Sequence, residues 1–181
     1  MTEKAPRAFL PAGIAVITVS DTRTLADDKS GDTLASRVTA AGHRLADRLI
    51  IKDEVRQIRA AVRKLAKRED VDVVITTGGT GLTGRDVTIE ALRPLFDKEI
   101  EGFGTVFHMI SFQKIGTSTM QSRATAGVVS GKYVFCLPGS PGACRDGWDD
   151  ILVKQLDYRH HPCNFIEIMP RLDEHLRRTG K

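Results

Sequence analysis

A glycine-rich segment in the middle of the chain carries the residues best suited to chemistry. Thr76-Thr77-Gly78-Gly79-Thr80-Gly81 directly follows an apolar run and precedes a helical pattern. Glycines at such a junction let the backbone approach a ligand closely and adopt positive φ, and exposed amides at a helix N-terminus attract phosphate. No Gly-Lys-Ser/Thr follows, so this is not a Walker A loop. The alternative is that the glycines only form a tight turn between a strand and a helix.

A second segment later in the chain has the same design. Pro138-Gly139-Ser140-Pro141-Gly142 follows another apolar run and precedes a second helical pattern. Two such loops at the carboxyl ends of one sheet would clamp opposite ends of a long anionic ligand. Pro-Gly dipeptides are above all turn formers, so this segment alone is weak evidence for a site.

Acidic side chains occur at the ends of the expected strands. Asp86 stands where the first glycine loop meets its helix, Asp53 follows the second strand, and Ser20 and Asp21 follow the first. Each could act only as a helix cap or compensate a helix dipole. A carboxylate near phosphate could instead hold Mg²⁺, which prefers oxygen ligands. Because strand ends converge at one edge of a doubly wound sheet, we expect some of these residues to act together.

Other chemistries find little support. The three cysteines, Cys136, Cys144 and Cys163, form no C-x-x-C pair and indicate neither a disulfide framework nor a zinc site. His160, His161 and Cys163 make an incomplete and oddly spaced metal set. No serine, histidine and acid combination presents itself as a hydrolytic triad.

The hydrophobic pattern predicts alternating strands and helices. Strands are expected at 14–19, 44–51, 71–76, 127–129 and 133–137; helices at 30–42 with Ser30 or Asp32 as N-cap, from 54 to 65, from 89 to 96, from 103 to 115 and after 143. The last two strands are joined by Ser130-Gly131-Lys132, a tight-turn sequence. Helices between strands imply an α/β fold with a largely parallel sheet covered on both faces.

Length and composition indicate one compact domain. The 181 residues are 41% hydrophobic and 28% charged, and no apolar run approaches the roughly 18 residues of a membrane span. We expect a cytoplasmic protein without a membrane partner. The net charge of +4 favours anionic partners, but part of it lies in the tail and no basic stripe alternates with aromatics, which disfavours nucleic acid.

Several motifs together resemble one known family. They are Val-Ile-Thr-Val-Ser-Asp near the start, Thr-Thr-Gly-Gly-Thr-Gly-Leu-Thr-Gly-Arg-Asp in the middle, and Glu-Gly-Phe-Gly, Ser-Arg-Ala and Leu-Pro-Gly-Ser-Pro later. They resemble the molybdopterin-binding domain shared by MoaB, MogA and gephyrin, over about residues 12–170. The resemblance divides the chain into an N-terminal extension (1–11), this domain (12–170) and a basic C-terminal tail (171–181).

The resemblance implies a three-layer α/β/α sandwich with a mostly parallel sheet, assembled as a trimer or hexamer. It also implies a role in molybdenum cofactor biosynthesis. In MogA-type members, ATP with magnesium donates AMP to the terminal phosphate of molybdopterin and pyrophosphate is released. Molybdopterin and ATP are then the partners and Mg²⁺ the cofactor.

Residue by residue, the resemblance places functional roles on this chain. Asp53 and Asp86 match the family's two functional aspartates: Asp86 would hold Mg²⁺, and Asp53 would help to place the metal or the attacking phosphate. The other matching or neighbouring residues of the expected cleft are Ser20, Asp21, Thr77, Gly78, Gly79, Thr80, Gly81, Ser122, Arg123, Pro138, Gly139, Ser140, Pro141 and Gly142.

Two functions remain open at this stage. The first is a molybdopterin adenylyltransferase, favoured because both aspartates are retained. The second is a non-catalytic protein that binds molybdopterin in the same cleft without transferring AMP, since the MoaB branch is less securely catalytic than the MogA branch. Ile89, where many members have proline, departs from the pattern without excluding either function.

Overall fold

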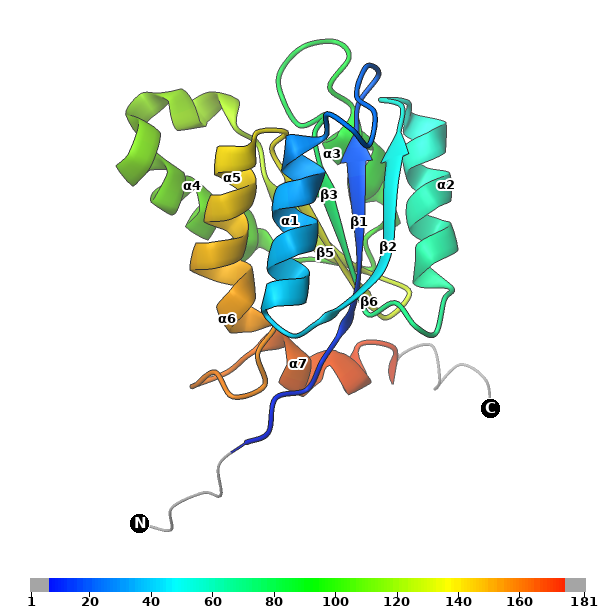
Figure 1. The fold of residues 1–181 in the computed structure, drawn as a ribbon, viewed down its shortest axis with the longest axis vertical. Helices are drawn as coiled ribbons and strands as arrows, with labels where there is room; N and C mark the ends of the chain where they lie inside the picture. The colour runs from blue at the N-terminus through cyan, green and yellow to red at the C-terminus, as the bar shows by residue number, and fades with distance from the viewer. Residues whose placement is uncertain (1–6, 175–181) are drawn as a thin grey trace.

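The computed structural model describes residues 7–174, which form one sheet with helices on both faces (Figure 1). The strands are β1 Gly13–Val19, β2 Arg44–Ile51, β3 Val73–Thr77, β4 Lys98–Glu99, β5 Thr125–Val129 and β6 Lys132–Leu137. The α-helices are α1 Lys29–Ala40, α2 Val55–Ala66, α3 Thr88–Leu92, α4 Glu101–Ile115, α5 Pro141–Arg145, α6 Val153–Gln155 and α7 Phe165–Ile168. Short 3₁₀ segments are η1 Arg93–Leu95, η2 Gly116–Gln121 and η4 Met169–Arg171, and η3 Asp146–Leu152 is π-helical.

The sheet has the strand order β2-β1-β3-β6-β5-β4. Strands β2, β1, β3 and β6 are parallel to one another, and β5 runs antiparallel to both of its neighbours, β6 and β4. The β5–β6 hairpin turns at Ser130 and Gly131, both with positive φ, which suits the tight turn predicted there. The parallel strands carry their carboxyl ends to one edge, at the top of Figure 1.

One face of the sheet is covered by α1, α4 and the α5–η3–α6 helix. Ile14 and Val16 of β1 point to this face, because alternate side chains of a strand lie on opposite sides. They pack in a core with Phe103 and Phe107 of α4 and Trp148 of η3. Burying this apolar face fixes the three helices against the sheet.

The other face is covered by α2 and α3. Ala15, Ile17 and Val19 of β1 point to it and pack with Ile58 and Val62 of α2. All seven residues of β1 are therefore buried, as expected of a parallel strand with helices on both sides. The predicted three-layer α/β/α fold is confirmed.

The predicted N-cap of α1 was wrong. Asp28, rather than Ser30 or Asp32, accepts the Gly31 amide at 2.9 Å and caps the helix. Its carboxylate is fully buried and also accepts the Thr18 hydroxyl and a guanidinium N–H of Arg48. The tertiary partners from two strands decide the cap, and sequence spacing does not reveal them.

The third strand begins later than predicted. Val71 is buried, but Asp72 turns toward β1 and accepts the Gly13 amide at 2.7 Å, so β3 starts at Val73. The short strand β4 and the segments η2 and α7 were not predicted, since two to six residues carry too little periodicity.

The two ends of the described chain pack against the domain. Arg7 forms an ion pair with Glu167 and lies over the Tyr158 ring, and Met169 and Leu172 pack against the core near the other end. The rest of the predicted basic tail, 175–181, lies outside the described residues. No helix within 7–174 is long and apolar enough to cross a membrane. The cytoplasmic location and the domain boundaries stay predictions.

Candidate functional site

The carboxyl ends of the parallel strands bring the predicted site residues to one edge of the sheet. Ser20 and Asp21 follow β1, Asp53 follows β2, and the two glycine loops follow β3 and β6. We call residues 77–81 the first glycine loop and residues 138–142 the second. The parallel register of β1, β3 and β6 sets these segments side by side.

The first glycine loop passes too close to its neighbours for side chains. Gly78 and Gly79 have φ of +98° and +62°, a region that glycine adopts readily. A Cβ on Gly78 would lie 2.3 Å from the Val19 carbonyl oxygen, and one on Gly79 would lie 2.3 Å from Thr88 Oγ1. The fold therefore requires these glycines to form the tight turn between strand and helix. This requirement is compatible with a role in ligand binding.

Asp53 lies against this loop from the end of β2. A Cβ on Gly79 would be only 2.7 Å from its Oδ1, and the Val87 amide donates to that oxygen at 3.4 Å. Burial raises the pKa of Asp53 above its ordinary value, and the nearby carboxylates of Asp86 and Asp21 raise it further. Burial and the neighbouring carboxylates thus both disfavour the ionised form of Asp53.

Asp86 lies against the other end of the loop. The hydroxyl and amide of Thr83 donate to its Oδ2 at 2.6 and 2.9 Å, and a Cβ on Gly81 would be 2.7 Å from the same oxygen. The hydrogen bond from the Thr83 hydroxyl lowers the pKa of Asp86 most, with help from the Thr83 and Gly81 amides. Asp86 is accordingly held as a carboxylate.

Asp21 connects the loops after β1 and β2. It accepts the Asp53 amide at 3.2 Å and forms an ion pair with Arg85, whose Nη2 is 2.6 Å away. Arg85 was not among the site residues predicted from the sequence, although it directly precedes Asp86. Ser20 instead supports its own turn, accepting the amides of Thr22 and Arg23.

The threonines of the first glycine loop face inward. Thr77 is fully buried and donates from its hydroxyl to the Pro138 carbonyl at 2.9 Å, which joins the two glycine loops. Thr80 is 3% exposed. The hydroxyls of the loop are therefore not exposed, and its partly buried positions are Gly79 and Gly81.

The second glycine loop is held differently. Ser140 accepts the Ala143 amide at 3.1 Å and caps α5, with Pro141 at the first turn. The Gly139 carbonyl accepts the Ser30 hydroxyl, and a Cβ on Gly139 would lie 3.0 Å from the Gly78 Cα. The second loop thus packs directly on the first.

Of the predicted pair Ser122 and Arg123 in the segment before β5, Arg123 reaches the first glycine loop and Ser122 bonds back to η2. The Ser122 amide donates to the Thr119 carbonyl, and the Arg123 guanidinium donates to carbonyls of the first glycine loop and to Glu90. Glu90 was not predicted, since an exposed glutamate on a short helix gives no sequence signal.

The oxygen ligands present suit a hard divalent cation. Asp53 and Asp86 flank one loop, and the crowding of carboxylates around Asp53 favours a bound positive charge. Within residues 7–174 no group of three or more His, Cys, Asp or Glu side chains could hold a metal ion. The two aspartates therefore need oxygen ligands from a substrate or water to complete such a site.

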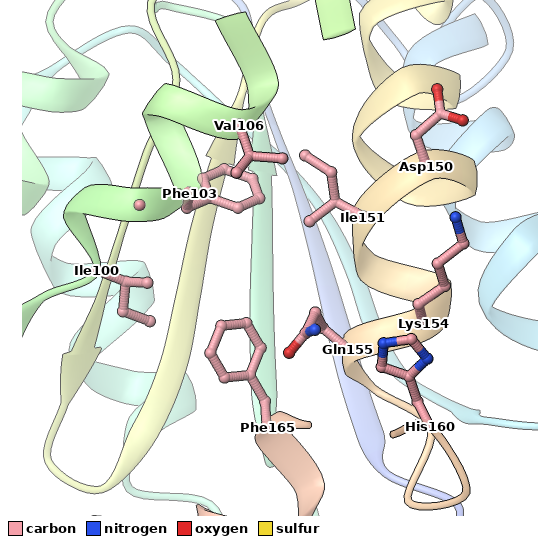
Figure 2. Close-up of a pocket in the computed structure, with 10 residues that line it drawn as sticks. Ile100, Phe103, Val106, Asp150, Ile151, Lys154, Gln155, His160 and Phe165 are labelled. Carbon is pink, nitrogen blue, oxygen red and sulfur yellow. The ribbon is translucent and has the colours of Figure 1, made fainter. Parts of the chain in front are cut away.

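Two cavities help to locate ligands. One of about 430 Å³ adjoins the site and is lined by residues after β1 and along β2, including Ser20, Asp21, Arg23, Arg48 and Lys52. Its three basic side chains suit an anion. The other, of about 320 Å³, lies between α4 and the α5–η3–α6 helix, where Phe103, Ile151 and Phe165 converge (Figure 2). It is largely apolar and lies apart from both glycine loops.

Comparison with known proteins identifies the family. Residues 15–158 match the family model described as "Probable molybdopterin binding domain". The chain belongs to this family. Within it, the chain is 52% identical to molybdenum cofactor biosynthesis protein B of Escherichia coli K12, over 87% of this chain and 92% of that protein. It is 46% identical to the protein of that name from Bacillus subtilis, over 78% and 84%.

Solved structures of the family agree with the fold. A crystal structure of molybdenum cofactor biosynthesis protein B superposes with a TM-score of 0.78 at 41% identity, covering 97% of this chain and 99% of that one. The tungsten cofactor synthesizing protein MoaB from Pyrococcus furiosus superposes with a TM-score of 0.74 at 35% identity, covering 93% and 99%. The predicted membership of the MoaB/MogA family is confirmed, and the chain carries a molybdopterin-binding domain of the kind found in molybdenum cofactor biosynthesis proteins.

Proposed function

We propose that this protein is a molybdopterin adenylyltransferase of molybdenum cofactor biosynthesis. An oxygen of the molybdopterin terminal phosphate would attack the α-phosphorus of ATP. The bond between the α-phosphorus and the bridging oxygen would break, releasing pyrophosphate and leaving AMP on the pterin. The observation that carries this proposal is the placement of Asp53 and Asp86 at Gly79 and Gly81 of one loop.

The residue types suit nucleotidyl transfer. Such a reaction needs in-line placement of two phosphates and neutralisation of their charge, and it needs no covalent intermediate on the protein. The backbone of the first glycine loop offers amides to the phosphates. Arg23 and Lys52 line the adjoining cavity and provide cationic surface for an anionic substrate, while Arg48 there is already paired with Asp28 and Asp32.

Magnesium completes the proposal as the cofactor. Asp53 and Asp86 would hold it, and when bound it would neutralise phosphate charge. Asp86 is kept ionised by Thr83 and the Gly81 amide, which keeps its oxygens available to a cation. Asp53, whose pKa is raised by burial and by neighbouring carboxylates, gains the most from a nearby positive charge.

The remaining predicted residues support this cleft. Thr77 ties the two loops together, Ser140 and Pro141 start α5, and Gly139 allows the close approach to Gly78. Ser20 and Asp21 line the adjoining cavity, and we propose Ser122, Pro138, Thr80 and Gly142 as further residues of the same cleft.

A direct assay tests the function. Purified protein is incubated with molybdopterin, ATP and Mg²⁺, and adenylylated molybdopterin and pyrophosphate are quantified. We expect both products in equal amounts, and none without Mg²⁺. Saturable molybdopterin binding without either product would replace this proposal by the non-catalytic binding protein.

We also propose that the chain forms a homo-oligomer through the outer face of α4. Its exposed side chains and those of the adjoining η2 are large and apolar: Val106, Met109, Phe112, Ile115 and Met120. Val106, Met109, Phe112 and Ile115 recur every three residues on one helix, and Val106 also lines the apolar cavity of Figure 2. A second copy of the chain is the occupant expected, because the family resemblance implies trimers or hexamers.

Light scattering tests the assembly. The wild-type mass should be three or six times 19.9 kDa, and Phe112→Glu should lower it toward that of one chain. Leu25→Glu is a matched control, because Leu25 is 60% exposed but lies outside α4. A monomeric wild type would overturn the proposal.

A further inference from the structure

Arg123 contacts the first glycine loop from the side of its carbonyl groups. Its Nε donates to the Thr80 carbonyl at 2.8 Å and its Nη2 to the Gly81 carbonyl at 2.6 Å. Its Nη1 donates to Glu90 Oε1, and Nη2 also reaches Glu90 Oε2 at 3.3 Å. One guanidinium thus joins the loop to α3.

These bonds occupy the guanidinium. A guanidinium has five N–H groups in a planar fork, and here four donor contacts go to protein oxygens. The side chain is 28% exposed, and Arg123 lowers the pKa of Glu90 chiefly through their hydrogen bond. A lone surface ion pair adds little to stability. The main effect of this arrangement is therefore geometric, because the planar guanidinium fixes the positions of the groups it bonds.

The direction of the two carbonyls has a consequence for the opposite side of the loop. In a trans peptide the C=O and the following N–H point in opposite directions. Arg123 on the carbonyls of Thr80 and Gly81 therefore directs the amides of Gly81 and Leu82 away from itself. A Cβ on Gly81 would lie 2.7 Å from Asp86 Oδ2, so the Asp86 carboxylate lies directly against this part of the loop.

We propose that Arg123, held by Glu90, is a positioning residue that fixes the first glycine loop so that its amides and the Asp86 carboxylate face the substrate phosphates. Gly81 has no side chain to restrict its peptide groups, so the guanidinium supplies the restriction. This inference rests on the proposed function and assigns Arg123 an indirect role in place of a direct contact with the substrate.

The experiment compares Arg123→Ala, Arg123→Lys and Glu90→Gln with the wild type. Lysine keeps the charge but cannot reproduce the fork. Arg93→Ala is the matched control, since Arg93 also forms an ion pair with a glutamate, Glu99, but this pair joins it to β4 and not to a glycine loop. Adenylylation gives kcat and KM for ATP, and ¹³C NMR of the Asp86 carboxyl gives its pKa without any need for turnover.

We expect both Arg123 variants to lower kcat by about 10- to 100-fold with little change in KM, since small misplacements cost up to about 100-fold. We expect the pKa of Asp86 to rise in both, and Glu90→Gln to give a smaller change in each measurement. Loss of charge alone would raise this pKa in the alanine variant only, so a wild-type value in Arg123→Lys would overturn the inference.

A raised KM with unchanged kcat and an unchanged Asp86 pKa would also overturn it, because that pattern marks direct substrate binding. If the wild type makes no product while the Asp86 pKa moves in both variants, the positioning role stands and the proposed function fails. If the alanine variant does not fold, the lysine variant decides.

Discussion

Two glycine-rich loops leave the same edge of the sheet, and their polar groups are used in different ways. The first has Gly78 and Gly79 at positive φ and lies between two carboxylates, Asp53 and Asp86. The second, after β6, caps α5 with Ser140 and packs Gly139 on Gly78. Two similar sequences after two strands thus give different loops. The first is flanked by two carboxylates, and the second packs against the first.

The contrast arises from what each loop meets. The first loop packs on the end of β1 at Val19, and the acidic side chains of Asp53 and Asp86 approach it at Gly79 and Gly81. The second loop meets mainly the first loop and α1, where Ser30 donates to the Gly139 carbonyl. Substitutions in the two loops should therefore separate effects on catalysis from effects on stability.

The largest expected difference is in turnover. Asp86→Asn should lower kcat by about 10²- to 10³-fold, because it removes a charged oxygen ligand proposed to hold Mg²⁺ at the reacting phosphates, while molybdopterin affinity changes little. The measurement is formation of adenylylated molybdopterin together with a binding titration. Asp150→Asn, which alters only an ion pair with Lys114 among its described bonds, is the control. Unchanged turnover in Asp86→Asn would remove the role given to this residue.

Glycine substitutions should distinguish the two loops by stability. Gly79→Ala should lower the free energy of unfolding by about 1–2 kcal/mol or more, from positive φ and from contact with Thr88 and Asp53. Gly142→Ala should change it by less than about 1 kcal/mol, because the nearest atom to the added Cβ is 3.8 Å away. Urea denaturation measures both. Equal losses would show that the loops are equally constrained.

The cap of the second loop gives a smaller effect. Ser140→Ala removes the bond to the Ala143 amide and should cost about 1 kcal/mol of stability. Turnover measured well below the melting temperature should stay within a few-fold of wild type. A kcat loss as large as that of Asp86→Asn would give the Ser140 hydroxyl a direct role with substrate.

The smallest effect should be a gain in stability. The pKa of Asp53 is raised in the fold, so its proton is bound more tightly there and its contribution to stability falls as pH rises through that pKa. Asp53→Asn should therefore stabilise the metal-free protein at pH 7, by about 0.5 kcal/mol or less at this partly exposed position.

The pH dependence of that gain supplies its control. Below the ordinary pKa of 3.8 the wild-type carboxyl is protonated too, so the advantage of Asp53→Asn should disappear. Asp86 has a lowered pKa and gives stability that is lost as pH falls through it, so Asp86→Asn should destabilise at pH 7. A destabilised Asp53→Asn protein at pH 7 would contradict the crowding inferred around Asp53.

The strands and the convergence of the loops could be predicted from sequence. Apolar runs such as 14–19 are long enough to predict a strand. Parallel strands place their carboxyl ends at the same edge of the sheet in any strand order. Contacts between distant side chains could not be predicted. Asp28 as the cap of α1 depends on Thr18 and Arg48, and the Arg123–Glu90 pair joins residues 33 positions apart.

The family resemblance predicted more of the candidate site residues than the local sequence pattern did. A glycine cluster by itself fits a turn as well as a phosphate site, and the structure demands those glycines for steric reasons alone. The roles of Asp53 and Asp86 came from resemblance, whereas Arg85 and Glu90 appear only once the loops are folded. Exposed charged residues without periodicity leave no signal of their own.

The central claim is that Asp53, Asp86 and the first glycine loop form one site for a metal and phosphates. The most direct measurement is a crystal structure grown with a non-hydrolysable ATP analogue and Mn²⁺, whose anomalous signal locates the metal. We predict an anomalous peak within about 2–3 Å of carboxylate oxygens of Asp53 and Asp86, with the phosphates against residues 77–81. A peak and phosphates bound elsewhere, with these carboxylates unchanged, would contradict the account.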